Sequence, residues 1–527
     1  MKTNPNRFWA IVILLGWVFD FLLWKRPAGI NFAIYVILCL VTGILLLRAD
    51  GLLLSRRGSL LLLPIAFLAS TSFLRLEPMT VFLSVSMTLF LMGVLALTYL
   101  GGRWMHYGLL DYASGYLRLS GSMIARPLGF AAEVRREEAS NEKRNVNIWP
   151  ILRGIVIALP VIAIFASLLS SADLVFAERF KEFVDLFNIE NLPEYIFRLV
   201  LILVIAYALA GIFLHAAQSE EKISEDKPFI PPFLGITEAT IVLGSLALLF
   251  AAFVIIQFQY FFGGQVNINI EGFTYSDYAR RGFGELVTVA FFSLLLLLGL
   301  GAVTRRENET HRRVFSGLGV VLVGLVLVML VSAFQRLVLY ETAYGFSRLR
   351  TYTHVFMIWL ALLLVTVVAL EILRSERKIG LAMVLASLGF VISLSVLNVD
   401  AFIVWQNIQR ELRGGIETST REGVSLDVNY FLSLSDDAVP PLVDAFHSKP
   451  LPAPVKEKLG AVLTCIRYNR RGENHLPWQS FHFSRLQADR ALASAQQDLD
   501  AYEMVETDMK VITPGGEEFS CWQYYYD

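Results

Sequence analysis

Charged residues are scarce in this sequence. Asp, Glu, Lys and Arg make up 17% of its 527 residues, whereas a soluble domain usually carries about 25%. The shortage is confined to the part before Asp400, where long apolar runs alternate with short charged loops. After Asp400 the composition resembles that of an ordinary soluble protein. The pattern therefore excludes a chain that is water-soluble throughout, and it predicts a domain boundary between residues 400 and 401.

Signatures of nucleic-acid binding and of common enzymes are also missing. The formal net charge is -1 and no basic stripe is present, so no nucleic-acid partner is expected. We find no Walker-type phosphate loop, no His-Glu-x-x-His, no Cys-x-x-Cys and no Gly-x-Ser-x-Gly. These absences make an enzyme less expected without excluding one. We expect no cofactor and no metal site, and the catalytic residues, if any, are unknown.

Cysteine is rare as well, with three in the chain. Cys39 lies inside an apolar run and is expected to be inert. Cys465 and Cys521 both follow residue 400, so they could form one disulfide if that region lies outside the cytoplasm. The alternative is two free, buried thiols.

Long apolar runs are what the sequence has in abundance. A membrane-spanning helix needs roughly 20 predominantly apolar residues, and eleven segments approach or reach that length: Phe8–Trp24, Ile30–Leu47, Ser59–Leu74, Met79–Leu100, Ile148–Ser170, Ile196–Ala217, Ile236–Phe262, Gly284–Thr304, Val314–Leu337, Thr353–Leu373 and Ile379–Leu397. The predicted fold is all-α: a polytopic membrane helix bundle of about 11 spans over residues 1–400. A small helical soluble domain is predicted over residues 401–527.

The distribution of Lys and Arg predicts the orientation. With the N-terminus inside, the inner loops carry roughly twice as many basic residues as the outer loops, which agrees with the positive-inside rule. An odd number of spans then places the C-terminal domain outside. Residues 103–130 mix aromatic and charged side chains and are predicted to lie in the membrane interface, against membrane lipids. The expected location is the bacterial cytoplasmic (inner) membrane.

The C-terminal region is predicted to be helical. Ser435 begins a helix that is interrupted near Pro450, and Val455–Tyr468 and Trp478–Val505 follow as further helices. Such a domain could dock a protein partner.

Polar residues concentrate in the segment QRLVLYETAYGFSRLRTYTH, which joins the ninth and tenth spans. Arg336, Tyr340 and Tyr344 recur every four residues and would share one helix face. Glu341 and Arg348 would also align if the helix continued past Gly345. An interfacial girdle would explain the Tyr and Arg residues, but a girdle does not require Glu beside them. The segment therefore has two readings, an anchor or a binding site.

Other polar residues fall at the predicted outer ends of other spans. Ionisable groups at membrane depth usually face a partner or a watery cavity, and Asp20 with Arg198, or Asp400 with Arg348, are plausible pairs. The loop Gly263–Phe283 could cover an outer pocket or be a simple connector. The candidate substrate-binding residues are Arg336, Tyr340, Glu341, Tyr344, Arg348, Arg350, Tyr352, His354, Asn398, Asp400, Asp20 and Arg198. For each one alone, an ordinary helix-end role is the alternative.

Four blocks in fixed order resemble a known family: YGFSRLRTYTHVFMIWLAL, LNVDAFIVWQNIQREL, YFLSLSDDAVPPLVDAF and WQSFHFSRLQADRAL. They are similar to the bacterial domain-of-unknown-function family 4173, which is close to family 4153. The resemblance covers roughly residues 340–492. It implies a multi-helix bacterial membrane protein and assigns no activity.

Three function classes remain open. The first is binding, transport or assembly of a lipid, envelope precursor or peptide at an outward-facing polar pocket. The second is an integral-membrane enzyme acting on such a substrate, with Glu341, Asp400 or His354 as acid or base and Arg348 or Arg350 holding a phosphate. The third is a sensor or docking protein that acts through its C-terminal domain.

Overall fold

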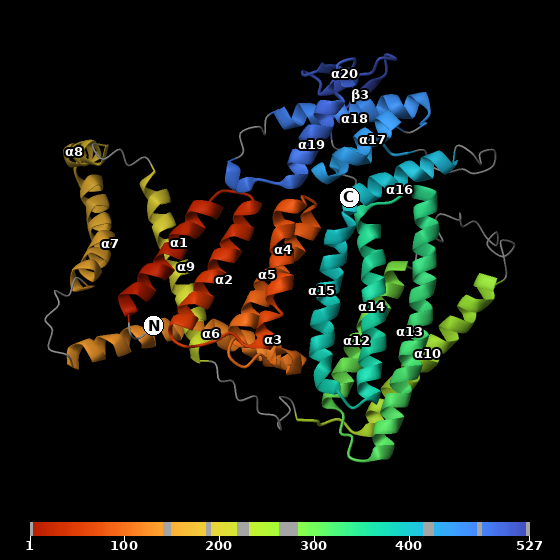
Figure 1. The fold of residues 1–527 in the computed structure, drawn as a ribbon, viewed down its shortest axis with the longest axis horizontal. Coiled ribbons are helices and arrows are strands. Elements are labelled where there is room, and N and C mark those ends of the chain that lie inside the picture. Colours follow the sequence, from red (N-terminus) through yellow and green to blue (C-terminus); the bar gives the residue numbers. More distant parts are fainter. Residues whose placement is uncertain are drawn as a thin grey trace. The chain divides into compact units, whose positions relative to one another are not determined.

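The structure, a computed structural model, describes residues 4–140, 149–185, 191–218, 231–262, 283–414, 426–448, 450–471 and 477–522. Helices dominate these residues, and three short strands lie near the C-terminus (Figure 1). The helices up to residue 397 are α1 (Pro5–Leu23), α2 (Ile30–Ala49), α3 (Arg56–Ser59), α4 (Leu62–Leu74), α5 (Pro78–Leu97), η1 (Arg103–His106), α6 (Leu109–Ser140), α7 (Trp149–Ala172), α8 (Leu174–Asp185), α9 (Leu192–Gln218), α10 (Ile236–Phe262), α12 (Phe283–Val303), α13 (Glu309–Tyr344), α14 (Arg348–Ile372), η3 (Glu376–Lys378) and α15 (Ile379–Leu397).

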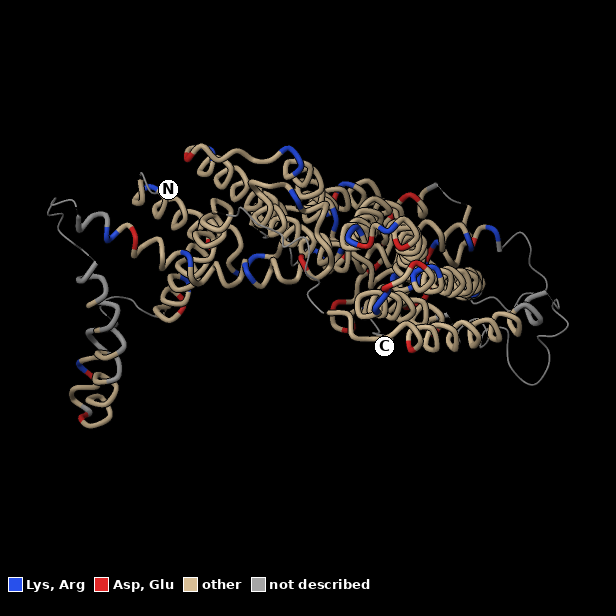
Figure 2. Tube along the Cα trace, turned by 90° about the horizontal axis from the view of Figure 1, so that it is seen from below, with Lys and Arg blue, Asp and Glu red and all other residues tan. Residues whose placement is uncertain are grey.

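Within the described residues, 10 helical segments are long and apolar enough to cross a membrane. They correspond to ten of the eleven segments expected from the sequence. Large apolar side chains on them point away from the protein: Leu63 is 79% exposed, Leu248 74% and Phe82 65%. Large exposed apolar surfaces of this kind on helices of spanning length indicate a lipid environment. Figure 2 shows that long stretches of these helices carry no charged residue. The chain is therefore a multi-pass membrane protein.

The remaining expected span, Ile148–Ser170, corresponds to helix α7, whose side chains are described only in part. The packing of α1, α6 and α9 indicates that the chain crosses the membrane once more between α6 and α9. Phe8, near the start of α1, contacts Phe130 of α6, whereas Trp24, just after α1, donates a hydrogen bond to Glu194 at the start of α9. The chain must therefore pass from one end of α1 to the other between α6 and α9. A 24-residue helix is about 36 Å long, which is enough.

The contacts between residues divide the chain into two compact units. The first comprises Met1–Trp24, Leu38–Leu52 and Arg118–Gln218, and the second comprises Lys25–Ile37, Leu53–Leu117 and Ser219–Asp527. In the first unit, α1 packs against α9. In the second, α13 packs against α10, α12 and α14, and α15 packs against α14 and α5. The second unit also contains the whole C-terminal region.

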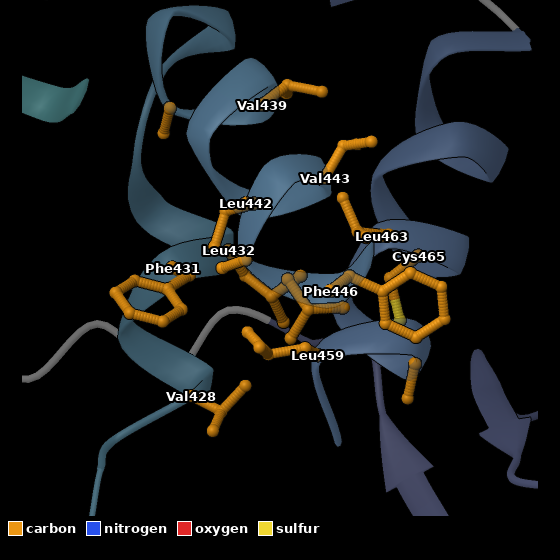
Figure 3. Packing of buried hydrophobic residues seen from close by; sticks show 14 of the residues in the cluster. Val428, Phe431, Leu432, Val439, Leu442, Val443, Phe446, Leu459, Leu463 and Cys465 are labelled. Carbon is orange, nitrogen blue, oxygen red and sulfur yellow. The ribbon is translucent and has the colours of Figure 1, made fainter. Parts of the chain in front are cut away.

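The C-terminal region comprises α16 (Val399–Gly414), η4 (Asn429–Ser433), η5 (Asp436–Ala438), α17 (Val439–Ser448), α18 (Ala453–Arg471), η6 (Trp478–Ser480), α19 (Phe483–Ser494), α20 (Gln496–Leu499), β1 (Glu503–Val505), β2 (Lys510–Ile512) and β3 (Glu518–Ser520). The strands form one antiparallel sheet in the order β1-β2-β3. The core of the C-terminal region is apolar and includes Phe431, Leu442, Phe446 and Leu459 (Figure 3). A disulfide joins Cys465 of α18 to Cys521, just after β3.

One expectation for this region is wrong. A single helix was expected over Trp478–Val505, but the segment contains η6, α19 and α20, and it ends in strand β1. The strand forms because Glu503–Val505 pairs in register with Lys510–Ile512, and such pairing depends on residues beyond the segment. The expected helix Val455–Tyr468 is confirmed by α18.

Candidate functional site

The candidate residues of the second unit gather where α13 ends and α14 begins. Helix α13 ends at Tyr344 because Gly345 has a φ of 82°, a conformation that only glycine adopts without strain. Helix α14 then starts at Arg348. Glu341 and Arg348 therefore lie on separate helices, so the condition for their alignment, a helix that continues past Gly345, is not met.

Arg348 and Asp400 form a buried ion pair. The Nε atom of Arg348 donates to Oδ1 of Asp400 at 2.8 Å, and Nη2 donates to Oδ2 at 2.6 Å. The Asp400 side chain has 0% of its surface exposed. It also accepts a hydrogen bond from the backbone N–H of Ser435 at 2.7 Å. The pair therefore ties the first residue of α14 to α16 and, through Ser435, to the C-terminal domain.

Glu77 forms a second link beside this pair. It precedes α5, and its carboxylate accepts hydrogen bonds from the backbone N–H groups of Met79 and Thr80 at 2.9 and 2.7 Å, which caps the helix. The Tyr352 hydroxyl donates to the same carboxylate. Glu77 is 2% exposed, so it joins α5 to α14 inside the protein.

Asp437 forms the third link, from the C-terminal domain back to the loop before α5. Its Oδ2 accepts the backbone N–H groups of Leu76 and Glu77 at 2.7 and 3.2 Å. Ser484 of α19 donates to its other oxygen. Burial raises the pKa of Asp437, and the hydrogen bonds and nearby Arg75 oppose that shift. We refer to Glu77, Arg348, Tyr352, Asp400 and Asp437 as the junction cluster.

Arg350 lies two residues after Arg348 but has different contacts. Its guanidinium lies over the ring of Tyr340, with Cζ 4.1 Å from the ring centroid, and it donates to the carbonyl of Gly345. Tyr344 packs against Tyr340 with ring centroids 5.0 Å apart. Among the described residues, no carboxylate lies within ion-pair distance of Arg350.

A second arginine lies beside the same turn. A side-chain carbon at Gly345 would be 3.4 Å from Cζ of Arg410, on α16. Burial lowers the pKa of Arg410; Glu411 opposes this shift, and the positive charge of Arg350 adds to it. Asn407 fixes the turn, because its amide accepts from Phe346 N at 2.7 Å and donates to Phe346 O at 3.0 Å. We refer to Arg350 and Arg410 as the arginine pair.

The other candidates of this unit lie at three separate places. Nδ1 of His354 is 3.3 Å from Oε1 of Glu341, and Glu341 is 2% exposed. This pair lies between α13 and α14. Arg336 instead donates to Oε1 of Gln257 on α10 at 2.9 Å. Asn398 follows α15 in the left-handed conformation, with a φ of 53°, which Asn tolerates better than most residues.

Asp20 and Arg198 belong to the first unit. Nε of Arg198 donates to both oxygens of Asp20 at 3.0 and 3.1 Å, and Asp20 is 3% exposed. Both ion pairs expected from the sequence, Asp20 with Arg198 and Asp400 with Arg348, are confirmed. Substrate binding by these residues stays a prediction.

Three residues of these clusters were missed by the sequence analysis: Glu77, Asp437 and Arg410. Glu77 stands just before Pro78 at a helix start, which is a capping pattern. Asp437 lies in the block SDDAVPP. Arg410 follows Asn407 by three residues on the same helix. Local signals thus existed for Glu77 and Asp437, but nothing local linked them to Arg348 or Asp400.

The loop Gly263–Phe283, expected to cover a pocket or connect spans, lies almost entirely outside the described residues. In the described part of the chain, no three His, Cys, Asp or Glu side chains come together as a metal site would require.

His482 makes the contact between the C-terminal domain and α2 sensitive to pH. It is 4% exposed. Burial lowers its pKa to about 4, and Arg485 adds to that effect while Asp436 opposes it. The ordinary pKa is about 6.5, so between pH 6.5 and 4 the unfolded chain takes up a proton that the folded protein does not. Stability is therefore fully present above pH 6.5 and is lost as the pH falls toward 4.

We expect His482→Asn to reduce this pH dependence by the share that His482 contributes. Wild-type protein should lose about 2–3 kcal/mol of stability between pH 7 and 4, measured as the thermal midpoint of the purified protein. The half-exposed His447 provides the control, because His447→Asn should retain the wild-type slope. Equal slopes in all three proteins would contradict the assignment to His482.

A family model described as "Domain of unknown function (DUF4153)" matches residues 62–445. No curated protein and no solved structure matches the chain. The family found is the expected neighbour, 4153; membership of family 4173 stays a prediction. The matched range contains Arg348, Asp400, the arginine pair and the Glu341–His354 pair.

Proposed function

The chain belongs to the DUF4153 family, and we propose that it binds the anionic head of a lipid or lipid-linked envelope precursor at the outer face of the bacterial cytoplasmic membrane. The arginine pair would hold the phosphate or carboxylate group. The sequence left binding, transport and assembly open as one function class, and this proposal selects binding. The C-terminal domain would lie beside the bound head and could receive a protein partner.

One observation carries this proposal: Arg350 and Arg410 flank the same turn, and no carboxylate within the described residues pairs with Arg350. Arginine guanidinium groups bind phosphate and carboxylate through charge-assisted hydrogen bonds. The nearby Arg348 is less suited to this role, because Asp400 occupies Nε and Nη2 of its guanidinium and compensates its charge. A bound anion would offset the repulsion that Arg350 exerts on Arg410.

The position of the arginine pair supports a lipid-like ligand. Arg350 lies in the first turn of α14, and Tyr340 and Tyr344 lie in the last two turns of α13. Both helices are long enough to span a membrane. Ends of membrane spans lie near the lipid head groups, where tyrosine is common. A ligand with an apolar tail and an anionic head would therefore place its head at this depth.

The orientation in the membrane is part of the proposal. The opposite end of the same helices carries many basic residues, including Arg305, Arg313, Arg374 and Lys378, as expected for a cytoplasmic surface. The disulfide between Cys465 and Cys521 agrees with an oxidising compartment for the other end.

Binding of a short-chain phosphatidylglycerol, kept below its critical micelle concentration, tests the proposal. Arg350→Gln should weaken its binding by roughly 10–100-fold, since a hydrogen bond to a charged group contributes about 1.5–3 kcal/mol. Binding to the wild-type protein should also weaken with rising salt. Arg313→Gln is the control: this side chain is 80% exposed at the other end of α13. Equal affinity in all three proteins would exclude the arginine pair as the site.

The Glu341–His354 pair favours an integral-membrane enzyme as the second candidate. A buried carboxylate beside an imidazole can exchange a proton with a substrate. The two functions differ in one variant: Glu341→Gln should leave phosphatidylglycerol binding intact but should stop any turnover.

A further inference from the structure

Residues 478–483, between α18 and α19, have their polarity reversed. Gln479, Ser480 and His482 are 4%, 2% and 4% exposed, whereas Trp478, Phe481 and Phe483 are 58%, 39% and 38% exposed. A surface in contact with water shows the opposite pattern. The core of the same domain is conventional, with apolar side chains inside (Figure 3). The pattern therefore indicates a medium around this segment that is at least partly apolar.

The segment is bonded to the ends of two membrane spans. The backbone N–H of Ile30, the first residue of α2, donates to the carbonyl of Phe481 at 3.1 Å. Ser480 donates to the carbonyl of Pro27 at 3.3 Å. Next to the segment, the Ser484 hydroxyl oxygen lies 2.7 Å from the carbonyl oxygen of Leu74, the last residue of α4, and its one hydrogen is shared between this carbonyl and Asp437. These bonds fix the height of the segment relative to the spans.

A close backbone approach makes this placement specific. A side-chain carbon at Gly29 would lie 2.9 Å from the carbonyl oxygen of Phe481 and 3.1 Å from Nε2 of His482. Only glycine allows these two backbone segments to come this close.

We propose that Trp478, Phe481 and Phe483 form an aromatic seat that inserts into the lipid leaflet next to the C-terminal domain. The head-group region extends several ångströms beyond the hydrocarbon core, so side chains level with the span ends lie within it. Trp is enriched at this depth because its ring is both apolar and polar. The partner is therefore the lipid surface itself, and the seat holds the C-terminal domain against the membrane independently of the arginine pair.

Spin labelling of the full-length protein in phosphatidylcholine–phosphatidylglycerol nanodiscs tests the seat. A nitroxide is attached at Trp478→Cys in a Cys39→Ala background, which leaves only the disulfide-bonded Cys465 and Cys521 besides the label site. The matched control is Gln497→Cys, an exposed residue of α20, a helix on the side of the C-terminal domain away from the spans of the second unit (Figure 1). The readout is the collision rate with oxygen, which concentrates in lipid, relative to a water-soluble nickel complex.

We expect the oxygen-to-nickel ratio at position 478 to be severalfold higher than at position 497. Equal ratios would show that the segment faces water and would overturn the proposal. If the Cys variant does not fold, Trp478→Phe provides the second measurement, because it removes one of 9 tryptophans. In nanodiscs with brominated lipid, this variant should lose part of the quenching seen in wild type, and unchanged fractional quenching would again overturn the proposal.

Discussion

Asp400→Ala should destabilise the protein by about 3–5 kcal/mol, the cost of leaving one partner of a buried ion pair alone. In this variant Arg348 would keep its positive charge but lose the carboxylate that pairs with it. The Arg348 side chain is largely buried, with 24% of its surface exposed. The backbone N–H of Ser435 would lose its acceptor at the same time. Thermal unfolding of the purified protein, together with protease cleavage of the C-terminal domain, measures the effect.

A surface ion pair provides the matched comparison. Glu309 pairs with Arg374, and both side chains are about half exposed. Glu309→Ala should cost less than about 1 kcal/mol, since water and ions screen exposed charges. The double variant Arg348→Met with Asp400→Leu should recover much of the loss, because it leaves no charge unpaired. A small effect of Asp400→Ala, close to that of Glu309→Ala, would show that the pair does not hold the junction together.

Loss of the Cys465–Cys521 disulfide should cost the C-terminal domain about 4 kcal/mol, from the loop entropy expected for this spacing. The two cysteines are separated by 56 residues, and the loop they close contains α19, α20 and the whole sheet. Without the bond, the unfolded chain gains freedom while the native packing around Cys465 stays apolar. Reductant should therefore lower the unfolding midpoint of the wild-type domain.

Cysteine variants separate this effect from a general action of the reductant. A protein with Cys465→Ala and Cys521→Ala should be less stable and should no longer respond to reductant. Cys39→Ala, which changes the buried cysteine of α2 that is not part of the disulfide, should respond like the wild type. If the wild-type midpoint is the same with and without reductant, the bridge does not stabilise the domain.

The junction cluster and the residues around the aromatic seat both attach the C-terminal domain to the membrane helices of the second unit. Arg348 pairs with Asp400, and Asp437 accepts from the backbone of Leu76 and Glu77, across the boundary between the membrane helices and the C-terminal domain. Residues 480–484 make similar bonds to Pro27, Ile30 and Leu74. The C-terminal domain is therefore held at several points, and a ligand at the arginine pair would lie next to a fixed surface.

The membrane helices were predictable because a span has a local signal. Crossing the hydrocarbon core requires a continuous apolar stretch of nearly fixed length, and the chain cannot leave backbone groups unsatisfied there. The expected segment Gly284–Thr304 thus agrees with α12, Phe283–Val303, almost to the residue. Strand β1 was missed because its partner strand, not its own composition, determines it.

The polar residues were predictable as a group but not as a network. The sequence by itself determined that Arg348, Asp400, Asp20 and Arg198 lie at span ends, where an ionisable group needs a partner. Only the tertiary structure decided that Tyr352 meets Glu77 across 275 residues and that Arg350 stays without a carboxylate among the described residues while Arg348 has one. The physical reason is that hydrophobic length is a property of one segment, whereas ion pairing depends on which helices pack together.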